Sequence, residues 1–381
     1  MSHLVPFLHG GFFYVVVFLV VLTVLVFVHE LGHYLIARRN GVKVEVFSIG
    51  FGPELFGWWD RAGTRWKFST IPLGGYVKMF GDSDASSALP VARLGELTAA
   101  ERDISFPCKR LGQRAAIVAG GPLANFIFAI VVLALLFMTY GQPYTPAEVG
   151  QVMPGSAAEA GGIHAGDAIV SIDGRAVDRF EDVQQVVRLN PSVPMTMVVR
   201  RDGALVNLQV TPSLIEESDR LGRRRIGQLG IRGGGTKYIQ RDPASAVVSA
   251  VAETWNLSAT TLQAMWQMVI GTRTTDELGG PLRIAQLSGE IAQGGIVPLL
   301  WFMAVLSVNL GLINLFPVPV LDGGHLLFYA AEAIRGKPLG QRAQEYGFRV
   351  GLALVLTLMV FATWNDLVHT GIVDIVKRFV T

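Results

Sequence analysis

Apolar residues gather in four long runs along the chain, and the segments between the runs are mixed or polar. The runs cover roughly residues 12–36, 115–140, 297–316 and 350–373. A helix needs about 20 mainly apolar residues to cross a lipid bilayer. The pattern therefore predicts an α-helical polytopic membrane protein with about four transmembrane helices.

The composition supports a membrane protein and excludes several other classes. Hydrophobic residues make up 51% of the chain and charged residues only 16%, whereas typical soluble domains are about a quarter charged. A net charge of +2, without basic runs interleaved with aromatics, argues against nucleic-acid binding. With Cys108 as the single cysteine, an intrachain disulfide and thiolate zinc sites are excluded. Any metal would be held by His, Asp or Glu.

The distribution of Lys and Arg predicts how the chain crosses the membrane. Basic residues are frequent between the first and second runs, and the residues before the first run contain none. The positive-inside rule then places residues 37–114 in the cytoplasm and residues 141–296 on the outer side. The chain thus divides into an N-terminal membrane part, 1–140, an outer part, 141–296, and a C-terminal membrane part, 297–381.

Two stretches between the first two runs have the alternation of β-strands. Residues 44–49 and 66–71 alternate in polarity, and both lead into glycine-rich turns. This predicts a β-hairpin or small sheet, although a plain surface hairpin fits the pattern equally well. Residues 82–92, which are polar and rich in small side chains, predict a flexible loop.

The outer part begins with the pattern of a small β-rich domain at residues 141–214. Glycine-containing turns at 154–155, 161–162, 166–167 and 173–174 separate short apolar stretches, and about 70 residues suffice for one compact domain. The pattern resembles a PDZ domain, so we call this segment the PDZ-like domain.

The remaining outer residues, 215–296, are predicted to hold a linker and a helical region. Residues 216–236 are charged and then glycine-rich, which favours a linker. Residues 245–270 carry apolar side chains at helical spacing. They predict an amphipathic helix on the outer membrane surface or, as an equal alternative, a helix packed on the PDZ-like domain.

The first apolar run contains the motif His-Glu-Leu-Gly-His at 29–33. On a helix, positions i and i+4 lie on one face about a turn apart. His29 and His33 can therefore bind one Zn²⁺, and Glu30 can accept a proton from metal-bound water. Because ionisable groups inside a spanning segment are costly, they are functional by default. The motif predicts a catalytic zinc centre.

A catalytic zinc site uses a third protein ligand besides an open position, and Asp322 is the candidate. It follows the third run, which ends on the same side of the membrane as His29 and His33. Two prolines and two glycines break the helix around it, and irregular backbone at membrane depth is tolerated only inside protein or beside a wet cavity. His325, three residues later, is an alternative ligand.

These motifs together resemble the site-2 protease family of intramembrane metalloproteases (peptidase M50), in its bacterial RseP-type branch. The first-span motif is paired there with Asn-x-x-Pro-x-Pro-x-Leu-Asp-Gly-Gly-His, which stands here at 314–325, and Gly-Pro-Leu-Ala-Asn at 121–125 adds to the match. The resemblance covers nearly the whole chain and implies that His29, His33 and Asp322 bind Zn²⁺, with Glu30 as the general base. One departure is that the best-known members have two PDZ domains, whereas this chain shows one.

The resemblance also implies a substrate and a location. The substrate would be a single-pass membrane protein, such as an anti-sigma factor or a leftover signal peptide, cut within its transmembrane segment in the bacterial inner membrane. Asn314 would contact it, and the membrane-associated β-loop with Gly74, Gly75 and Tyr76 would pair with the unwound substrate. The active site would lie near the cytoplasmic side. The PDZ-like domain would lie in the periplasm and either bind a substrate C-terminus or exclude folded ectodomains by size.

Two other classes of function are alternatives to a protease. Intramembrane His, Glu and Asp also occur in transporters and proton pathways, but the chain shows metal-ligand spacing and no inverted repeat. A catalytically inactive membrane adaptor would use only the PDZ-like domain and lipid contacts. The intact Glu30 argues against an adaptor, because an inactive protein has no need of the base.

Overall fold

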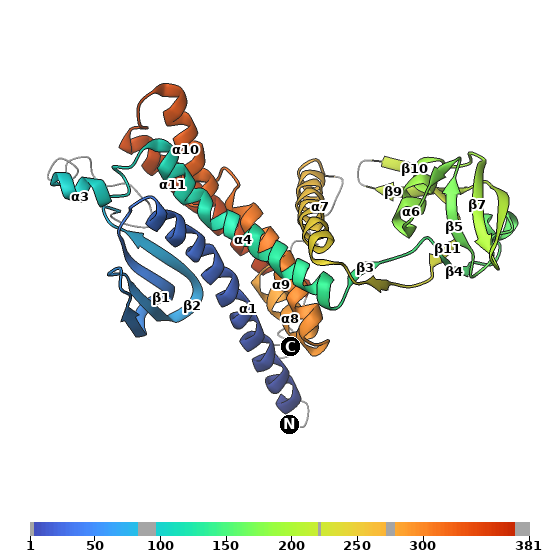
Figure 1. The fold of residues 1–381 in the computed structure, drawn as a ribbon, viewed down its shortest axis with the longest axis horizontal. Coiled ribbons are helices and arrows are strands. Elements are labelled where there is room, and N and C mark those ends of the chain that lie inside the picture. Colours follow the sequence, from blue (N-terminus) through green and yellow to red (C-terminus); the bar gives the residue numbers. More distant parts are fainter. Residues whose placement is uncertain (1–3, 83–96, 220–221, 272–278, 370–381) are drawn as a thin grey trace, which may run out of the picture. The chain divides into compact units, whose positions relative to one another are not determined.

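The computed structural model describes residues 4–82, 97–219, 222–271 and 279–369 (Figure 1). The described chain separates into two compact units. The membrane unit comprises the residues up to Ala134, Val247–Leu262 and the residues from Gly279 onward, and the β-rich unit comprises Leu135–Ala246 with the residues just after Leu262. The predicted loop at 82–92 lies outside the described residues except for Asp82.

Four helices of the membrane unit are long and apolar enough to cross a bilayer, which confirms the predicted polytopic fold. The candidate spans are Phe12–Arg39, Leu111–Thr139, Ile296–Asn314 and Arg342–Leu367. They lie in helices α1 (Leu4–Arg39), α4 (Leu111–Thr139), α9 (Ile296–Asn314) and α11 (Gln341–His369). Shorter helices connect or flank them, namely α3 (Ala99–Ile104), α8 (Pro281–Gln293) and α10 (Asp322–Arg335).

Helices α1 and α4 run side by side (Figure 1) and touch at a pair of glycines. A Cβ on Gly32 would lie 2.2 Å from the carbonyl oxygen of Gly120, and one on Gly120 would lie 2.8 Å from that of Gly32. Small residues permit this close approach of backbones in membranes, where packing contacts hold helices together. Neither position has room for a larger side chain.

The two long strands β1 (Val44–Trp59) and β2 (Arg65–Met79) fold back on themselves into a small sheet. Residues 46–49 pair with 75–78 on one side and with 65–68 on the other, and 65–68 also pair with 56–59. Stacked rings follow this order, since Trp66 lies 4.1 Å from Phe47 and 6.1 Å from Trp58 between ring centroids. The predicted small sheet is therefore present, and residues 75–79 form one of its edges.

Asp60, in the turn between β1 and β2, fastens the sheet to α1. Its carboxylate accepts hydrogen bonds from Tyr34 Oη on α1 at 2.8 Å, from Trp66 Nε1 at 3.0 Å and from the main-chain N–H groups of Ala62 and Thr64. Burial raises the pKa of Asp60, but the hydrogen bonds outweigh it and lower the pKa to about 2. The sheet is thus held beside the end of α1 that carries the histidines.

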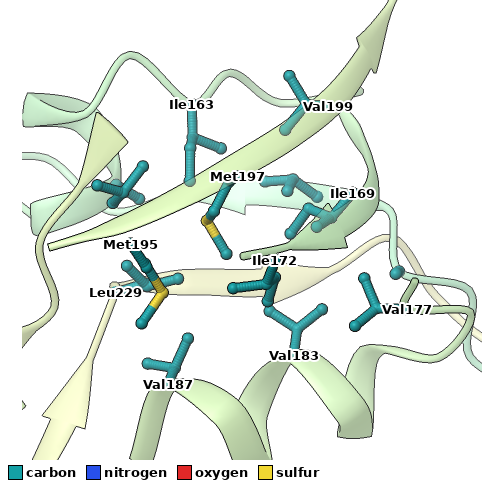
Figure 2. Close-up of a cluster of buried hydrophobic side chains, with 14 residues drawn as sticks. Ile163, Ile169, Ile172, Val177, Val183, Val187, Met195, Met197, Val199 and Leu229 are labelled. Carbon is teal, nitrogen blue, oxygen red and sulfur yellow. The ribbon is translucent and has the colours of Figure 1, made fainter. Parts of the chain in front are cut away.

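The β-rich unit holds the PDZ-like domain, with the four-stranded order β6-β5-β7-β8 and short helices at its side. Figure 2 shows Val183 and Val187 on α6 pointing toward Ile172 and Met195 in the sheet. All four side chains are buried, with a core of other aliphatic residues around them. The elements are β3 (Gln142–Tyr144), β4 (Val149–Val152), α5 (Ala157–Ala160), β5 (Ala168–Ile172), β6 (Arg175–Ala176), α6 (Phe180–Leu189), β7 (Met195–Arg201) and β8 (Ala204–Val210).

The segment predicted as a linker, 216–236, contains strands instead. Strand β9 (Ser213–Asp219) pairs with β10 (Gly222–Gln228), and β11 (Ile231–Gly233) pairs with β4. The register sets the Cα atoms of Glu217 and Arg224, and of Glu216 and Arg225, opposite each other, so the charged stretch that suggested a linker belongs to a hairpin. Leu229 is buried in the domain core. The domain therefore extends beyond residue 214, and β12 (Lys237–Ile239) pairs with β3.

The predicted helix at 245–270 is α7 (Pro243–Val269). It starts at Asp242, whose carboxylate accepts hydrogen bonds from the N–H groups of Ala244 and Ser245. The hydroxyl of Thr261 donates to Asn309 Oδ1 on α9 at 3.0 Å. The middle of α7 thus contacts a membrane-spanning helix, which disfavours the alternative that it packs only on the PDZ-like domain.

Candidate metal centre

Helix α1 presents two imidazoles toward one point. His29 and His33 are each only 9% exposed, and their Nε2 atoms lie 3.2 Å apart. The four-residue spacing accounts for this geometry because it stacks the two side chains on one helix face.

Asp322 brings a carboxylate to the same point from a distant part of the chain. Its Oδ2 lies 3.1 Å from His29 Nε2, and its Oδ1 lies 3.5 Å from His33 Nε2. It is the first residue of α10, and residues 315–321 make the turn that connects α9 to α10. This turn depends on Gly323 and Gly324, where an added Cβ would lie 2.2–2.4 Å from carbonyl oxygens of the preceding residues. Val320, just before, has a φ of 109°, a strained value for a β-branched residue.

The donor atoms of these three residues fit the coordination shell of zinc. Ligands about 2.0 Å from a tetrahedral zinc ion are separated from one another by roughly 3.3 Å. The two Nε2 atoms are 3.2 Å apart, and they lie 3.1 and 3.5 Å from the two carboxylate oxygens of Asp322. Two imidazoles and a carboxylate leave one position open, as in catalytic sites. Among the described residues, the donor group that can hold a metal ion comprises His29, His33 and Asp322. His325 is not part of it, and its ring lies 5.3 Å from that of Phe348.

Glu30 lines the same pocket as the three candidate ligands, next to the sheet edge. A Cβ on Gly75 would lie 3.1 Å from Cγ of Glu30 and 2.9 Å from Val26, so the glycine lets the edge strand pass directly over α1. Tyr76 and Val77 continue the lining. The pocket therefore joins a carboxylate, a candidate metal centre and a strand edge.

The other predicted substrate-contacting residues differ in position. Asn314, the last residue of α9, lines the pocket together with Gly75 and Tyr76. Gly74 does not line it. Instead Gly74 makes the turn, with a φ of 125°, and packs against the ring of Phe51. The structure thus brings three of these four residues to the candidate centre.

Helix α4 contributes polar contacts that sequence reasoning did not identify. His33 Nδ1 lies 2.9 Å from the carbonyl oxygen of Ile117, and His29 Nδ1 lies 3.1 Å from Nδ2 of Asn125. Asn125 is fully buried. The signals for the second contact were a polar Asn in an apolar run and its place in the motif at 121–125. A main-chain acceptor such as Ile117 leaves no signal in side-chain identity.

Comparison with known families gives one match over most of the chain. The model of peptidase family M50 matches residues 17–358. A protein of Rhizobium meliloti (strain 1021), named as a predicted zinc metalloprotease, is 48% identical over 355 residues, which cover 92% of this chain and 95% of its own. Metalloprotease MmpA of Caulobacter vibrioides is 40% identical over 373 residues, with 92% and 94% covered.

Solved structures similar to this chain include single PDZ domains. The PDZ domain of HtrA3 bound to a phage-derived ligand is 26% identical, with a TM-score of 0.18, and the match covers 20% of this chain and 83% of that domain. The PDZ domain of an SdrC-like protein from Listeria innocua is 19% identical, with a TM-score of 0.20, and the match covers 24% and 98%.

Proposed function

The chain belongs to peptidase family M50, and on that premise we propose that it is an intramembrane zinc endopeptidase that cleaves transmembrane segments of single-pass membrane proteins. The observation that carries the proposal is the convergence of His29 Nε2, His33 Nε2 and the carboxylate of Asp322, with distances of 3.1–3.5 Å between them, at the end of a spanning helix. Zinc is the cofactor that this donor set favours.

Zinc held by these three residues would polarise the scissile carbonyl and bring the pKa of a bound water near 7. Glu30 lines the pocket from the position next to His29. Its carboxylate takes the proton from the attacking water and later delivers it to the leaving amine. Asn314 lines the same pocket and supplies an amide that can hydrogen-bond the substrate backbone beside the cut.

The sheet edge at residues 75–79 is proposed to hold the unwound substrate. A helical substrate hides its peptide bonds in internal hydrogen bonds, so the cleaved segment must be extended. Residues 75–78 pair with β1 on one side, and among the described strands none covers the other side. Because Gly75 lies over Glu30, a strand added to this edge would place its peptide bonds beside the catalytic carboxylate.

We further propose the location that the charge distribution favours. Lys and Arg are frequent between α1 and α4, which by the positive-inside rule favours a position of this region and the metal centre near the cytoplasmic face of a bacterial inner membrane. The PDZ-like domain then lies in the periplasm. Suitable substrates are single-pass proteins whose ectodomains have already been shortened, such as anti-sigma factors, or leftover signal peptides.

The PDZ-like domain offers a groove for a peptide end. Residues of α6, including Gln184 and Arg188, and residues 229–232 line this groove. Strand β11 pairs with β4 and leaves main-chain groups for an added strand. We propose that the groove binds the C-terminus of a shortened substrate, the usual mode for such folds. The alternative is that the domain binds no peptide end and only excludes large ectodomains by its size.

The central experiment uses the purified full-length protein in detergent with a labelled single-span substrate. Replacing Glu30→Gln should lower the cleavage rate by about a thousandfold, since general-base catalysis contributes 10²–10⁴, while bound zinc stays at the wild-type level. Replacing His29→Ala or adding a chelator should remove zinc and cleavage together. If wild type binds zinc but cuts none of a panel of spans, transport or adaptor functions gain support. If wild type binds no zinc, the proposal fails.

Strand addition at the edge has a separate test in Val77→Pro. Phe80 N–H donates to Lys43 O, so alternation along the strand turns the Val77 N–H away from β1 and toward the free edge. Proline removes that donor, and cleavage should fall at least tenfold with zinc unchanged. Val77→Ala, which keeps the N–H, is the control. Equal cleavage by both variants would show that strand addition at this edge is not required.

A further inference from the structure

The two candidate histidine ligands must present their Nε2 atoms unprotonated to a metal. The Nε2 atoms of His29 and His33 and the carboxylate of Asp322 converge on one point. A neutral imidazole that ligates through Nε2 carries its proton on Nδ1, and that proton needs an acceptor. The acceptor fixes both the tautomer and the ring orientation.

For His33 the acceptor is a main-chain carbonyl. Its Nδ1 lies 2.9 Å from Ile117 O, and a carbonyl can only accept. The tautomer with the proton on Nδ1 is therefore selected by the backbone of α4, and Nε2 is left free for metal. This contact is built into the crossing of α1 and α4 and needs no particular side chain.

For His29 the corresponding partner is the side chain of Asn125. Its Nδ2 lies 3.1 Å from His29 Nδ1, the side chain is completely buried, and Oδ1 accepts no hydrogen bond from the described residues. A half-turn of the amide exchanges the two atoms and brings the unused Oδ1 to face His29. An amide can serve either tautomer, because Nδ2 donates to a bare Nδ1 and Oδ1 accepts from a protonated one. Only the second orientation frees Nε2 of His29 for a metal.

One face of α4 holds these features in a row. Ile117, Gly121 and Asn125 are spaced at i, i+4 and i+8, so they lie on one side of the helix. A Cβ on Gly121 would lie 2.3 Å from His33 Nε2 and 2.8 Å from His29 Nε2, so the glycine lets this face approach both rings. Ser307 on α9 donates to the main-chain oxygen of Asn125 at 2.9 Å and braces the helix from the other side.

From this geometry we propose that Asn125 is a positioning residue for the metal centre. Its amide turns Oδ1 toward His29 and selects the Nδ1-protonated tautomer that binds zinc. Asn125 does not touch substrate or metal, and it acts through the orientation of His29. This inference rests on the proposed zinc centre and adds to it a residue that controls metal affinity.

The test measures zinc dissociation constants of full-length protein in detergent by competition with a chelator, and records the visible spectrum of the Co²⁺ form. Asn125→Leu removes the acceptor at similar volume and should weaken zinc binding 10–100-fold, the usual effect of losing such a partner, with a changed Co²⁺ spectrum. Asn125→Asp keeps an acceptor and should bind zinc within about threefold of wild type. Ser307→Ala removes only the brace and should also stay within about threefold of wild type.

Three results would overturn the inference. Asn125→Leu could bind zinc like wild type, Asn125→Asp could be as weak as Asn125→Leu, or Ser307→Ala could be as weak as either. The first would remove any role of the amide, and the other two would assign the effect to helix packing. Absence of zinc binding by wild type is a different result, because it would refute the proposed function itself along with this inference.

Discussion

The metal centre and the PDZ-like domain are assembled from the chain in different ways. The candidate ligands come from opposite ends of the sequence, on α1 and α10, and their partners come from α4. The core of the PDZ-like domain uses buried aliphatic residues from one stretch, Ala147 to Leu229. The metal centre depends on how closely the helices cross, whereas the core of the PDZ-like domain depends on side-chain volume within one local fold. Substitutions should therefore act on the two regions independently.

The largest difference between the two regions is expected for Gly121→Ala, which should change zinc affinity and leave the PDZ-like domain unchanged. The added Cβ would lie 2.3 Å from His33 Nε2 and 2.8 Å from His29 Nε2, so the two rings or α4 must shift, and either shift disturbs the candidate ligands. Zinc affinity should fall by about 100-fold or more, whereas the folding of the PDZ-like domain should not change. Zinc competition assays and limited proteolysis of the full-length protein measure the two quantities.

A matched control exists on the same helix. Gly112 also lies in α4, and a Cβ there would meet nothing within 4 Å. Gly112→Ala should leave zinc affinity unchanged, because the added methyl group meets no neighbour. The helix itself should not be weakened, since alanine is favoured over glycine in a helix by up to about 1 kcal/mol. If Gly121→Ala bound zinc as tightly as Gly112→Ala, the close helix crossing would not be what shapes the metal centre.

The next effect is on the PDZ-like domain alone. Asp167 is buried, and its carboxylate accepts hydrogen bonds from Arg201 Nε at 2.8 Å and Nη2 at 2.7 Å. Asp167→Asn leaves Arg201 without its charge partner and should lower the free energy of unfolding of the domain by about 2–3 kcal/mol. Zinc affinity should not change. Asp178→Asn, at an exposed carboxylate, is the control and should stay within about 0.5 kcal/mol of wild type.

Low pH should remove the stabilisation that the Asp167 carboxylate gives to the wild-type PDZ-like domain. Hydrogen bonds from Arg201 lower the pKa of Asp167, although burial opposes them. A carboxyl with a lowered folded pKa stabilises the fold fully above its unfolded pKa of about 3.9, and this is lost as pH falls through the folded pKa. The stability difference between wild type and Asp167→Asn should therefore be constant from pH 5 to 7 and shrink below about pH 4. An undiminished difference at pH 3 would contradict the assignment.

The parts of the protein that could be predicted from sequence are those encoded by local spacing. His29 and His33 follow from the i, i+4 period, the four spans follow from runs of apolar residues, and Asp322 follows from its place in the broken helix after the third run. The contact of Asn125 with His29 could not be predicted, since it depends on the crossing of α1 and α4.

Two other features could not be predicted from sequence for a similar reason: the strand order of the small sheet, and the hairpin in the segment predicted as a linker. Residues 65–68 pair with both 46–49 and 56–59, an arrangement that alternation along single strands does not specify. The stretch at 216–236 predicts a linker because it is charged and then glycine-rich. Its pairing as strands β9 and β10 is specified only by the register between the two segments. Pairing between segments, not the character of one segment, decides both cases.

The smallest effect is expected in the groove between α6 and β11, and it distinguishes binding from exclusion. Ile231→Asp places a charge in the apolar lining and should weaken binding of a C-terminal peptide to the full-length protein by at least tenfold. Cleavage of a shortened substrate should then slow by a few-fold, and cleavage of one with a blocked outer C-terminus should not change. If both substrates are cut at wild-type rates while peptide binding is lost, the groove does not select substrates. The domain would then act through its size, and the metal centre would set the cleavage rate without help from the groove.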